Sequence, residues 1–160
     1  MTPDVNVLVA ASRADHPHHA VARTWLEAAL QAAGAGAAFT LMPMVLASFL
    51  RLVTSPRIFH QVTPIEEAVA FVDALLASPG VHLATLGPEW PKLRGLCLEK
   101  QLGGNDVPDA WLAATVAQVG EHLVSFDRDF KKLLGRSQFT LLAPMQALPV
   151  QACSSSSVLR

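Results

Sequence analysis

Charge is what this sequence has little of. Only 16% of its 160 residues are charged, against about 25% in an average soluble domain. The formal net charge is −1, so the chain lacks the strongly basic balance with which many proteins hold nucleic acid by bulk electrostatics. A nucleic-acid substrate would therefore need a local basic patch. The large uncharged surface that remains indicates self-association or a permanent partner.

Cysteines and long apolar runs are scarce as well. Cys97 and Cys153 lie far apart and form no CxxC pair, which argues against a disulfide framework or a structural zinc site. No basic stretch followed by a long apolar run opens the sequence, and no apolar run approaches the length of about 18 residues that a membrane-spanning helix needs. We therefore expect no signal peptide, no membrane contact and a cytoplasmic location.

The apolar residues alternate between two spacings, which predicts an α/β fold. Strand-like segments cover residues 37–41, 81–85, 122–126 and 139–143, after a short first strand that turns helical soon after Asn6. Helical spacing covers residues 17–33, 44–54, 88–102 and 107–119, and a further helix that runs to about residue 78 and starts at a capping box, Thr63 to Glu66. Such alternation predicts a central, mainly parallel sheet with helices on both faces, a three-layer α/β/α sandwich.

One domain accounts for most of the chain. The length suits a single core, and neither a repeat nor a linker interrupts residues 1–143. Residues 144–160 contain prolines and a run of serines without periodicity, so we expect them to form a loose tail.

Three aspartates occupy positions that a parallel sheet brings together. Asp4 lies at the end of the first strand, Asp127 follows the strand at 122–126, and Asp109 lies in the first turn of the helix leading into that strand. Ligands bind beyond the carboxyl ends of parallel strands, near the point where the strand order reverses. Carboxylates gathered there repel one another unless a cation compensates their charge. Because no Cys or His accompanies them, the set favours Mg²⁺ or Mn²⁺, and hence a phosphate ester substrate.

Each aspartate also has a purely structural interpretation. Asp109 could simply be a first-turn residue stabilised by the helix dipole, Asp127 could cap the following turn, and Asp4 could be a turn residue. If all three aspartates were purely structural, their position at the same edge of the sheet would be a coincidence. Asn6, Asp106 and Asp129 are close enough in sequence to support the site.

Five stretches together resemble a known family. They are DVNVLVAA at 4–11, DHPHHAVARTWLE at 15–27, VLASFLRLVTSPRIF at 45–59, GNDVPDAWLAATV at 104–116 and LVSFDRDF at 123–130. In this order, over roughly residues 1–142, they resemble a PIN domain, and more narrowly the VapC toxins of toxin–antitoxin pairs. The resemblance implies an endoribonuclease dependent on Mg²⁺ or Mn²⁺. It also implies a homodimer, a VapB-type antitoxin as partner and RNA as substrate.

The resemblance assigns site residues one at a time. Asp4, Asp109 and Asp127 match the first, third and fourth acids of the family and are the expected metal ligands and catalytic residues. Asn6 and Asp129 match its supporting positions. The second acid is missing: Ser48 takes its place, or Ala47 if the alignment shifts by one residue, and no Asp or Glu occurs between residues 28 and 65. Asp106, where related sequences carry an apolar residue, is a candidate to compensate, in which case Asp106→Ala should weaken Mg²⁺ binding.

Basic and apolar residues complete the expectations. A local patch for the RNA backbone would comprise Arg13, Arg51, Arg128, Lys131 and Lys132, although the two lysines could equally form a solvated helix face. Phe49, Leu50 and Val53 could form a hydrophobic groove for the antitoxin.

Two rival functions remain open at this stage. One is a phosphatase of the haloacid dehalogenase type, although this chain reads Asp4-Val5-Asn6 where such enzymes carry a DxD motif. The other is a degenerate domain that binds RNA or its antitoxin without cleavage, an alternative that Ser48 keeps open.

Overall fold

A computed structural model describes residues 1–143; the expected loose tail at 144–160 lies outside the described residues. The strands are β1 (Thr2–Pro3), β2 (Phe39–Leu41), β3 (Val81–Leu83), β4 (Leu123–Ser125) and β5 (Phe139–Leu141). The α-helices are α1 (Val5–Ser12), α2 (His19–Gly34), α3 (Pro43–Val53), α4 (Ile65–Leu76), α5 (Trp90–Glu99) and α6 (Asp106–Val119), and a 3₁₀ helix, η1 (Arg128–Lys132), follows β4.

The strands are parallel and place β1 at the centre of the sheet. Hydrogen bonds join β1, β4 and β5 in that order, and β2 pairs with β3. The two groups meet between β1 and β2, where the amide of Thr40 donates to the carbonyl of Met1 at 2.9 Å. The strand order is therefore β3-β2-β1-β4-β5, and the reversal that favours a ligand site falls between β1 and β4.

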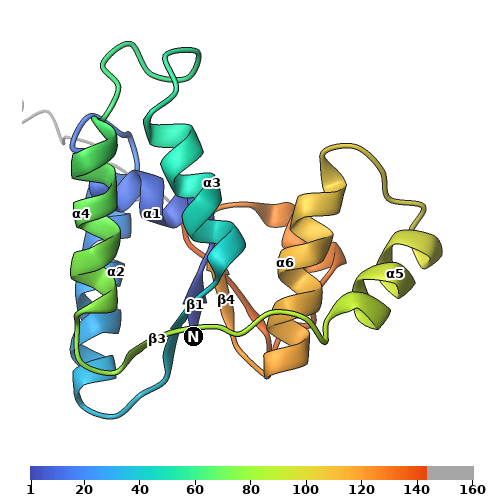
Figure 1. The fold of residues 1–160 in the computed structure, drawn as a ribbon. Coiled ribbons are helices and arrows are strands. Elements are labelled where there is room, and N and C mark those ends of the chain that lie inside the picture. The colour runs from blue at the N-terminus through green and yellow to red at the C-terminus, as the bar shows by residue number, and fades with distance from the viewer. Residues whose placement is uncertain (144–160) are drawn as a thin grey trace, which may run out of the picture.

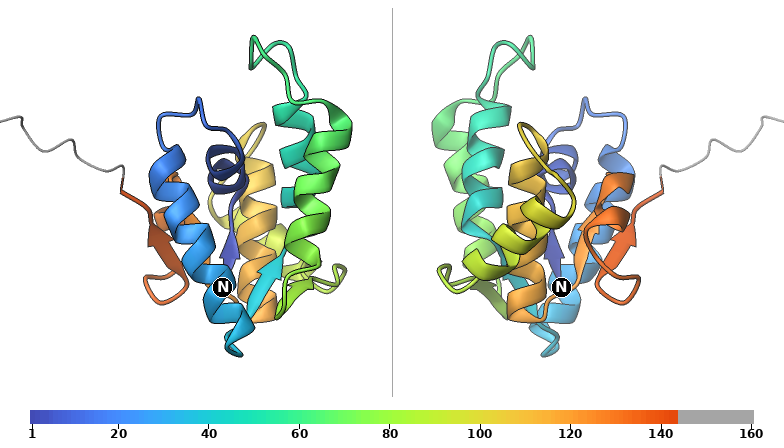
Figure 2. Two further views of the ribbon diagram at one scale, coloured as in Figure 1. Left: turned by 90° about the vertical axis from the view of Figure 1, so that its left-hand side faces the viewer. Right: turned by 90° about the vertical axis from the view of Figure 1, so that its right-hand side faces the viewer.

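Helices cover the strands on opposite sides, which confirms the predicted α/β/α fold class. Figure 1 shows α2 and α4 on one side of the strands and α5 and α6 on the other. Helix α1 packs between α2 and α3, as the side views in Figure 2 show. Its sequence is apolar around most of its circumference, and Val7, Leu8 and Ala10 are completely buried. Among the described residues, no helix is long and apolar enough to span a membrane.

Two local expectations were wrong. The first helix begins at Val5, before Asn6, because the Asp4 side chain accepts the Val5 amide and caps the helix. The capping box at Thr63 is absent: α4 begins without a side-chain cap. The hydroxyl of Thr63 instead accepts a hydrogen bond from Arg13 at 3.1 Å, so a tertiary contact has displaced the local one.

Candidate active site

The pairing of β1 with β4 brings two of the aspartates to the same edge of the sheet. Pro3 lies opposite Val124 in the parallel register, and the amide of Asp4 donates to the carbonyl of Val124 at 2.9 Å. Asp4 therefore comes level with Ser125, the last residue of β4, and Asp127 follows two residues later. Each of these aspartates also caps a helix: Asp4 caps α1, and Asp127 Oδ1 accepts the Asp129 amide at the start of η1. Capping and a role in the site are therefore compatible.

The hydroxyl of Ser125 connects the polar groups of this edge. It donates to Asp4 Oδ2 at 2.6 Å and accepts from Asn6 Nδ2 and from the Asp127 amide, each at 2.9 Å. Asn6 Oδ1 accepts the Phe126 amide at 3.2 Å. Ser125 is completely buried, so its one proton and two lone pairs are all used. The sequence analysis missed this residue; its position opposite Asp4 in a parallel β1–β4 pair is the signal that could have found it.

Asp4 is a buried carboxyl group, since only 5% of its surface is exposed. Burial raises the pKa of Asp4 from 3.8 to about 6, although the hydrogen bonds from Ser125 and Val5 act in the opposite direction. The nearby carboxylates of Asp109 and Asp127 raise it further. Near neutral pH the site therefore holds a negative charge in surroundings that disfavour it.

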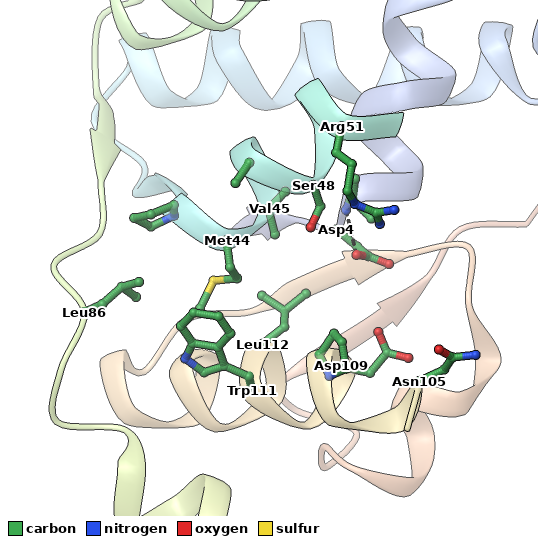
Figure 3. A pocket seen from close by; sticks show the side chains of 14 residues that line it. Asp4, Met44, Val45, Ser48, Arg51, Leu86, Asn105, Asp109, Trp111 and Leu112 are labelled. Carbon is green, nitrogen blue, oxygen red and sulfur yellow. Dashed lines mark hydrogen bonds between the residues drawn. The ribbon is translucent and has the colours of Figure 1, made fainter. Parts of the chain in front are cut away.

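Asp109 faces Asp4 from the opposite wall. The two residues line the same cleft, and Figure 3 shows their carboxylates pointing toward one another from α6 and the end of β1. The pKa of Asp109 is also raised, first by partial burial and then by the charges of Asp127, Asp106 and Asp129. The structure thus brings the three aspartates within electrostatic reach of one another.

This donor set suits a hard divalent cation without forming a finished cage. Within residues 1–143, no three His, Cys, Asp or Glu side chains are gathered closely enough to hold an ion between them. Mg²⁺ keeps several of its own waters and needs only one or two protein carboxylates, so a looser arrangement remains compatible with it. Burial is the main cause of the raised pKa of Asp4 and Asp109, and the repulsion between carboxylates adds to it. A cation would relieve that repulsion.

The cleft between α3 and α6 has a volume of about 830 Å³. Ser48 and Arg51 line it from α3, one helical turn apart, and Figure 3 shows the Ser48 hydroxyl directed into the cleft. The position of the missing second acid is thus inside the cleft and occupied by a neutral side chain. Asn105 lines the same end of the cleft.

Asp106 lies on the other side of Asp109. It is exposed and lines a second hollow of about 320 Å³, together with Asp109, Asp129 and Lys132. Neither Asp106 nor Asp129 is among the residues that line the larger cleft with Asp4 and Ser48. Asp106 is therefore not placed beside Ser48 in the larger cleft, although its charge acts on Asp109.

The basic residues divide into free and engaged side chains. Arg51, Arg128 and Lys131 are exposed, whereas Lys132 pairs with Asp129 at 2.6 Å. Arg13 is only 8% exposed. Its guanidinium donates to Asp15, to the Thr63 hydroxyl and to the Gln61 carbonyl, and it stacks on the Phe59 ring, 3.9 Å from the centroid. Arg13 fastens the 59–63 loop to the end of α1 and is not available to bind RNA.

Within residues 1–143, Phe49, Leu50 and Val53 do not form the exposed groove that was expected for the antitoxin. Phe49 and Val53 are buried in the core, and Leu50 packs against it. Large apolar side chains are instead exposed at the start of α4 and in the loop before it: Ile58, Val62, Ile65 and Val69.

The carboxylate-lined cleft lies at the reversal of the strand order, where open α/β sheets bind their ligands, and its carboxylates suit metal-assisted hydrolysis. The family model described as "PIN domain" matches residues 1–134. Ribonuclease VapC31 of Mycobacterium tuberculosis is 47% identical over 133 residues, covering 81% of this chain and 89% of its own. Ribonuclease VapC25 of the same species is 45% identical over 131 residues, with the same coverage of each chain. This chain belongs to the PIN-domain family, among the VapC proteins.

Two solved structures share the fold. One is VapBC2 from Rickettsia felis bound to a DNA fragment from its promoter, with a TM-score of 0.57, 17% identity and coverage of 82% of this chain and 91% of that chain. The other is Mycobacterium tuberculosis VapC20, a sarcin-ricin loop cleaving toxin, with a TM-score of 0.54, 20% identity and coverage of 82% and 92%. Membership of the PIN family excludes the haloacid dehalogenase alternative.

Proposed function

We propose that this chain is the toxin of a type II toxin–antitoxin pair, an endoribonuclease that hydrolyses RNA phosphodiester bonds with Mg²⁺ or Mn²⁺. The observation that carries the proposal is the meeting of Asp4, Asp109 and Asp127 at the strand reversal, beside an open cleft. The relatives named as VapC ribonucleases match most of the chain, which supports the same chemistry here.

In this proposal the carboxylates of Asp4, Asp109 and Asp127 bind the metal ion, directly or through the waters that it keeps. When bound, the ion lowers the pKa of a water molecule and offsets the charge that develops on the phosphate. Ser125 holds the Asp4 carboxylate and the Asp127 backbone in place, and Asn6 fixes the Phe126 amide between them. Because water is the nucleophile, no side-chain nucleophile is needed.

Exposed basic side chains would bind the RNA backbone. Arg51 lines the cleft beside Asp4, and Arg128 and Lys131 follow Asp127 on η1. Asp129 holds Lys132 in an ion pair and so limits the positive charge at this end. These few residues provide a local patch on a chain whose net charge is −1.

The partner in this proposal is a VapB-type antitoxin, and the toxin itself forms a homodimer in the cytoplasm, where RNA is available. The solved VapBC2 complex of Rickettsia felis supports the first part. The low share of charged residues in the chain supports both an interface with the antitoxin and an interface between two copies of the toxin.

The experiment is cleavage of total RNA by the purified chain, free of antitoxin, with Mn²⁺ or Mg²⁺ and with EDTA, alongside Asp4→Asn. The proposal expects cleavage that requires the metal and is lost in Asp4→Asn. A folded protein that binds metal but leaves RNA intact would overturn it.

The degenerate binder is the second candidate, and Ser48 in the cleft is the observation that favours it. The discriminating variant is Ser48→Glu. If it creates cleavage in an otherwise inert protein, the natural chain is degenerate; if the wild type already cleaves, that candidate is excluded.

A further inference from the structure

The cleft has two chemically different ends. Its acidic end contains Asp4 and Asp109, and its other end is lined by the apolar side chains Met44, Leu86, Trp111 and Leu112. Figure 3 shows the Trp111 indole and the Met44 side chain directed toward each other across the cleft. Trp111 is half-buried, so part of its ring remains free to contact a ligand.

A buried glutamate fixes the orientation of this indole. Trp111 Nε1 donates to Glu89 Oε1 at 3.0 Å, and the Gly87 amide donates to Glu89 Oε2 at 2.7 Å. Glu89 is only 7% exposed and precedes the first residue of α5, where the helix dipole favours a carboxylate. The hydrogen bond from Trp111, followed by that from Gly87, holds the pKa of Glu89 below its usual value, so the acceptor stays ionised.

The surroundings of Trp111 differ from those of the other tryptophans. The described part of the chain contains two other tryptophans with different surroundings: Trp25 packs against Phe39 in the core, and Trp90 is 63% exposed on α5. Trp111 alone among the three lines the cleft. The segment that carries Glu89 also supplies Leu86 to the cleft wall. The hydrogen bond thus joins the Trp111 ring to the segment that also forms this part of the cleft wall.

The spacing along α6 suits a nucleotide. Trp111 and Leu112 follow Asp109 by two and three residues on α6, so the acidic and apolar ends lie roughly 3–5 Å apart along the helix axis, and all three residues line the cleft. A volume of about 830 Å³ exceeds what a metal-bound phosphate alone would fill, and it lies in the range of small-molecule sites. An apolar wall beside phosphate-binding chemistry fits a base attached to that phosphate.

We propose that the apolar end of the cleft is a nucleobase subsite, in which the base next to the scissile phosphate stacks on the Trp111 indole. Glu89 is a positioning residue that holds the indole for this contact. The proposal rests on the proposed function, because it takes RNA as the ligand of the cleft. It makes Trp111 a determinant of which RNA positions are cleaved.

The first test is cleavage of a random-sequence single-stranded RNA library with Mn²⁺, mapped by sequencing the ends. Trp111→Leu should flatten the base preference beside the cleaved bond and raise KM about tenfold, the scale of one base–aromatic stack, with kcat changed less than twofold. Trp111→Phe should restore most of the preference, because it keeps an aromatic face. Glu89→Gln should give an intermediate KM.

Trp90→Leu is the matched control, because it removes an exposed tryptophan outside the cleft; it should leave KM and the preference unchanged. Thermal unfolding of every variant separates loss of the subsite from loss of the fold. If Trp111→Leu keeps the wild-type preference and KM, or if kcat and thermal stability fall while KM does not change, Trp111 is a structural residue and the proposal is overturned.

A binding measurement keeps this test distinct from that of the proposed function. In the double variant Trp25→Phe, Trp90→Phe, Trp111 is the only tryptophan left, and single-stranded RNA of random sequence should quench its fluorescence. Quenching without cleavage would leave the subsite standing while the nuclease proposal fails. If the protein cleaves RNA but RNA does not quench Trp111, and Trp111→Leu leaves KM unchanged, the nuclease proposal stands and the subsite proposal fails.

Discussion

The buried carboxyl group of Asp4 gives the metal-free protein an unusual dependence of stability on pH. The pKa of Asp4 is raised from 3.8 to about 6, chiefly by burial, so the fold favours the protonated form. Between about pH 4 and pH 6 the unfolded chain has released this proton while the folded chain retains it. The free energy of unfolding should therefore fall as the pH rises through this window, by about 3 kcal/mol in total.

The assay is urea unfolding in EDTA, followed by circular dichroism from pH 4.5 to 7.5, for the wild type and Asp4→Asn. The difference between the two curves reports on Asp4 together with its coupling to the nearby carboxylates of Asp109 and Asp127, because the more distant titrating groups are common to both. The side-chain amide introduced by Asp4→Asn changes the contact with Ser125, but the amide does not titrate, so this change adds an offset that does not vary with pH. Asp73→Asn, on the exposed surface of α4, is the control and should run parallel to the wild type. If the wild type and Asp4→Asn change with pH by the same amount, the burial argument is refuted.

Three further predictions follow from the contacts of single side chains. Ser125→Ala should lower the free energy of unfolding by about 2 kcal/mol, since it leaves buried partners unsatisfied, and should lower RNA cleavage at least tenfold. Ser125→Thr keeps the hydroxyl and should recover both stability and cleavage. A wild-type cleavage rate in Ser125→Ala would contradict this role of Ser125. Arg13→Met should cost about 2 kcal/mol in urea unfolding, whereas Arg23→Met, which breaks an exposed i,i+4 pair with Glu27, should cost no more than about 0.5 kcal/mol; equal costs would refute the role of the Arg13 contacts. Ser48→Glu should destabilise the metal-free protein at neutral pH by adding a carboxylate beside Asp4 and should increase the stabilisation that Mn²⁺ gives in thermal unfolding; an unchanged metal response would place Ser48 outside the ligand set.

The sequence was sufficient for features that depend on local pattern and chain direction. Alternating strands and helices predicted the parallel sheet, and the positions of Asp4 and Asp127 at strand ends predicted that they would share an edge. The same pattern predicted that Asp109 would lie at this edge. A helix that leads into a parallel strand runs back across the sheet, so its first turn lies near the carboxyl ends of the strands.

Contacts between distant segments were beyond this reasoning. Arg13 looked like a surface cation until the fold brought Gln61 and Thr63 to it, 48 and 50 residues away along the chain. The same contact removed the capping box that the local pattern of Thr63 predicted. The hydrogen bond between Glu89 and Trp111 depends on how α5 packs against α6, and no spacing within either helix encodes it.

The most direct test of the central claim compares two neighbouring aspartates on α6. Asp109 lines the cleft with Asp4, whereas Asp106, one turn earlier, is exposed and outside it. With saturating Mn²⁺ and total RNA, Asp109→Asn should abolish cleavage, and Asp106→Asn should retain most of the wild-type rate. Undiminished cleavage by a folded Asp109→Asn protein would contradict the assignment of the three aspartates as the site that cleaves RNA.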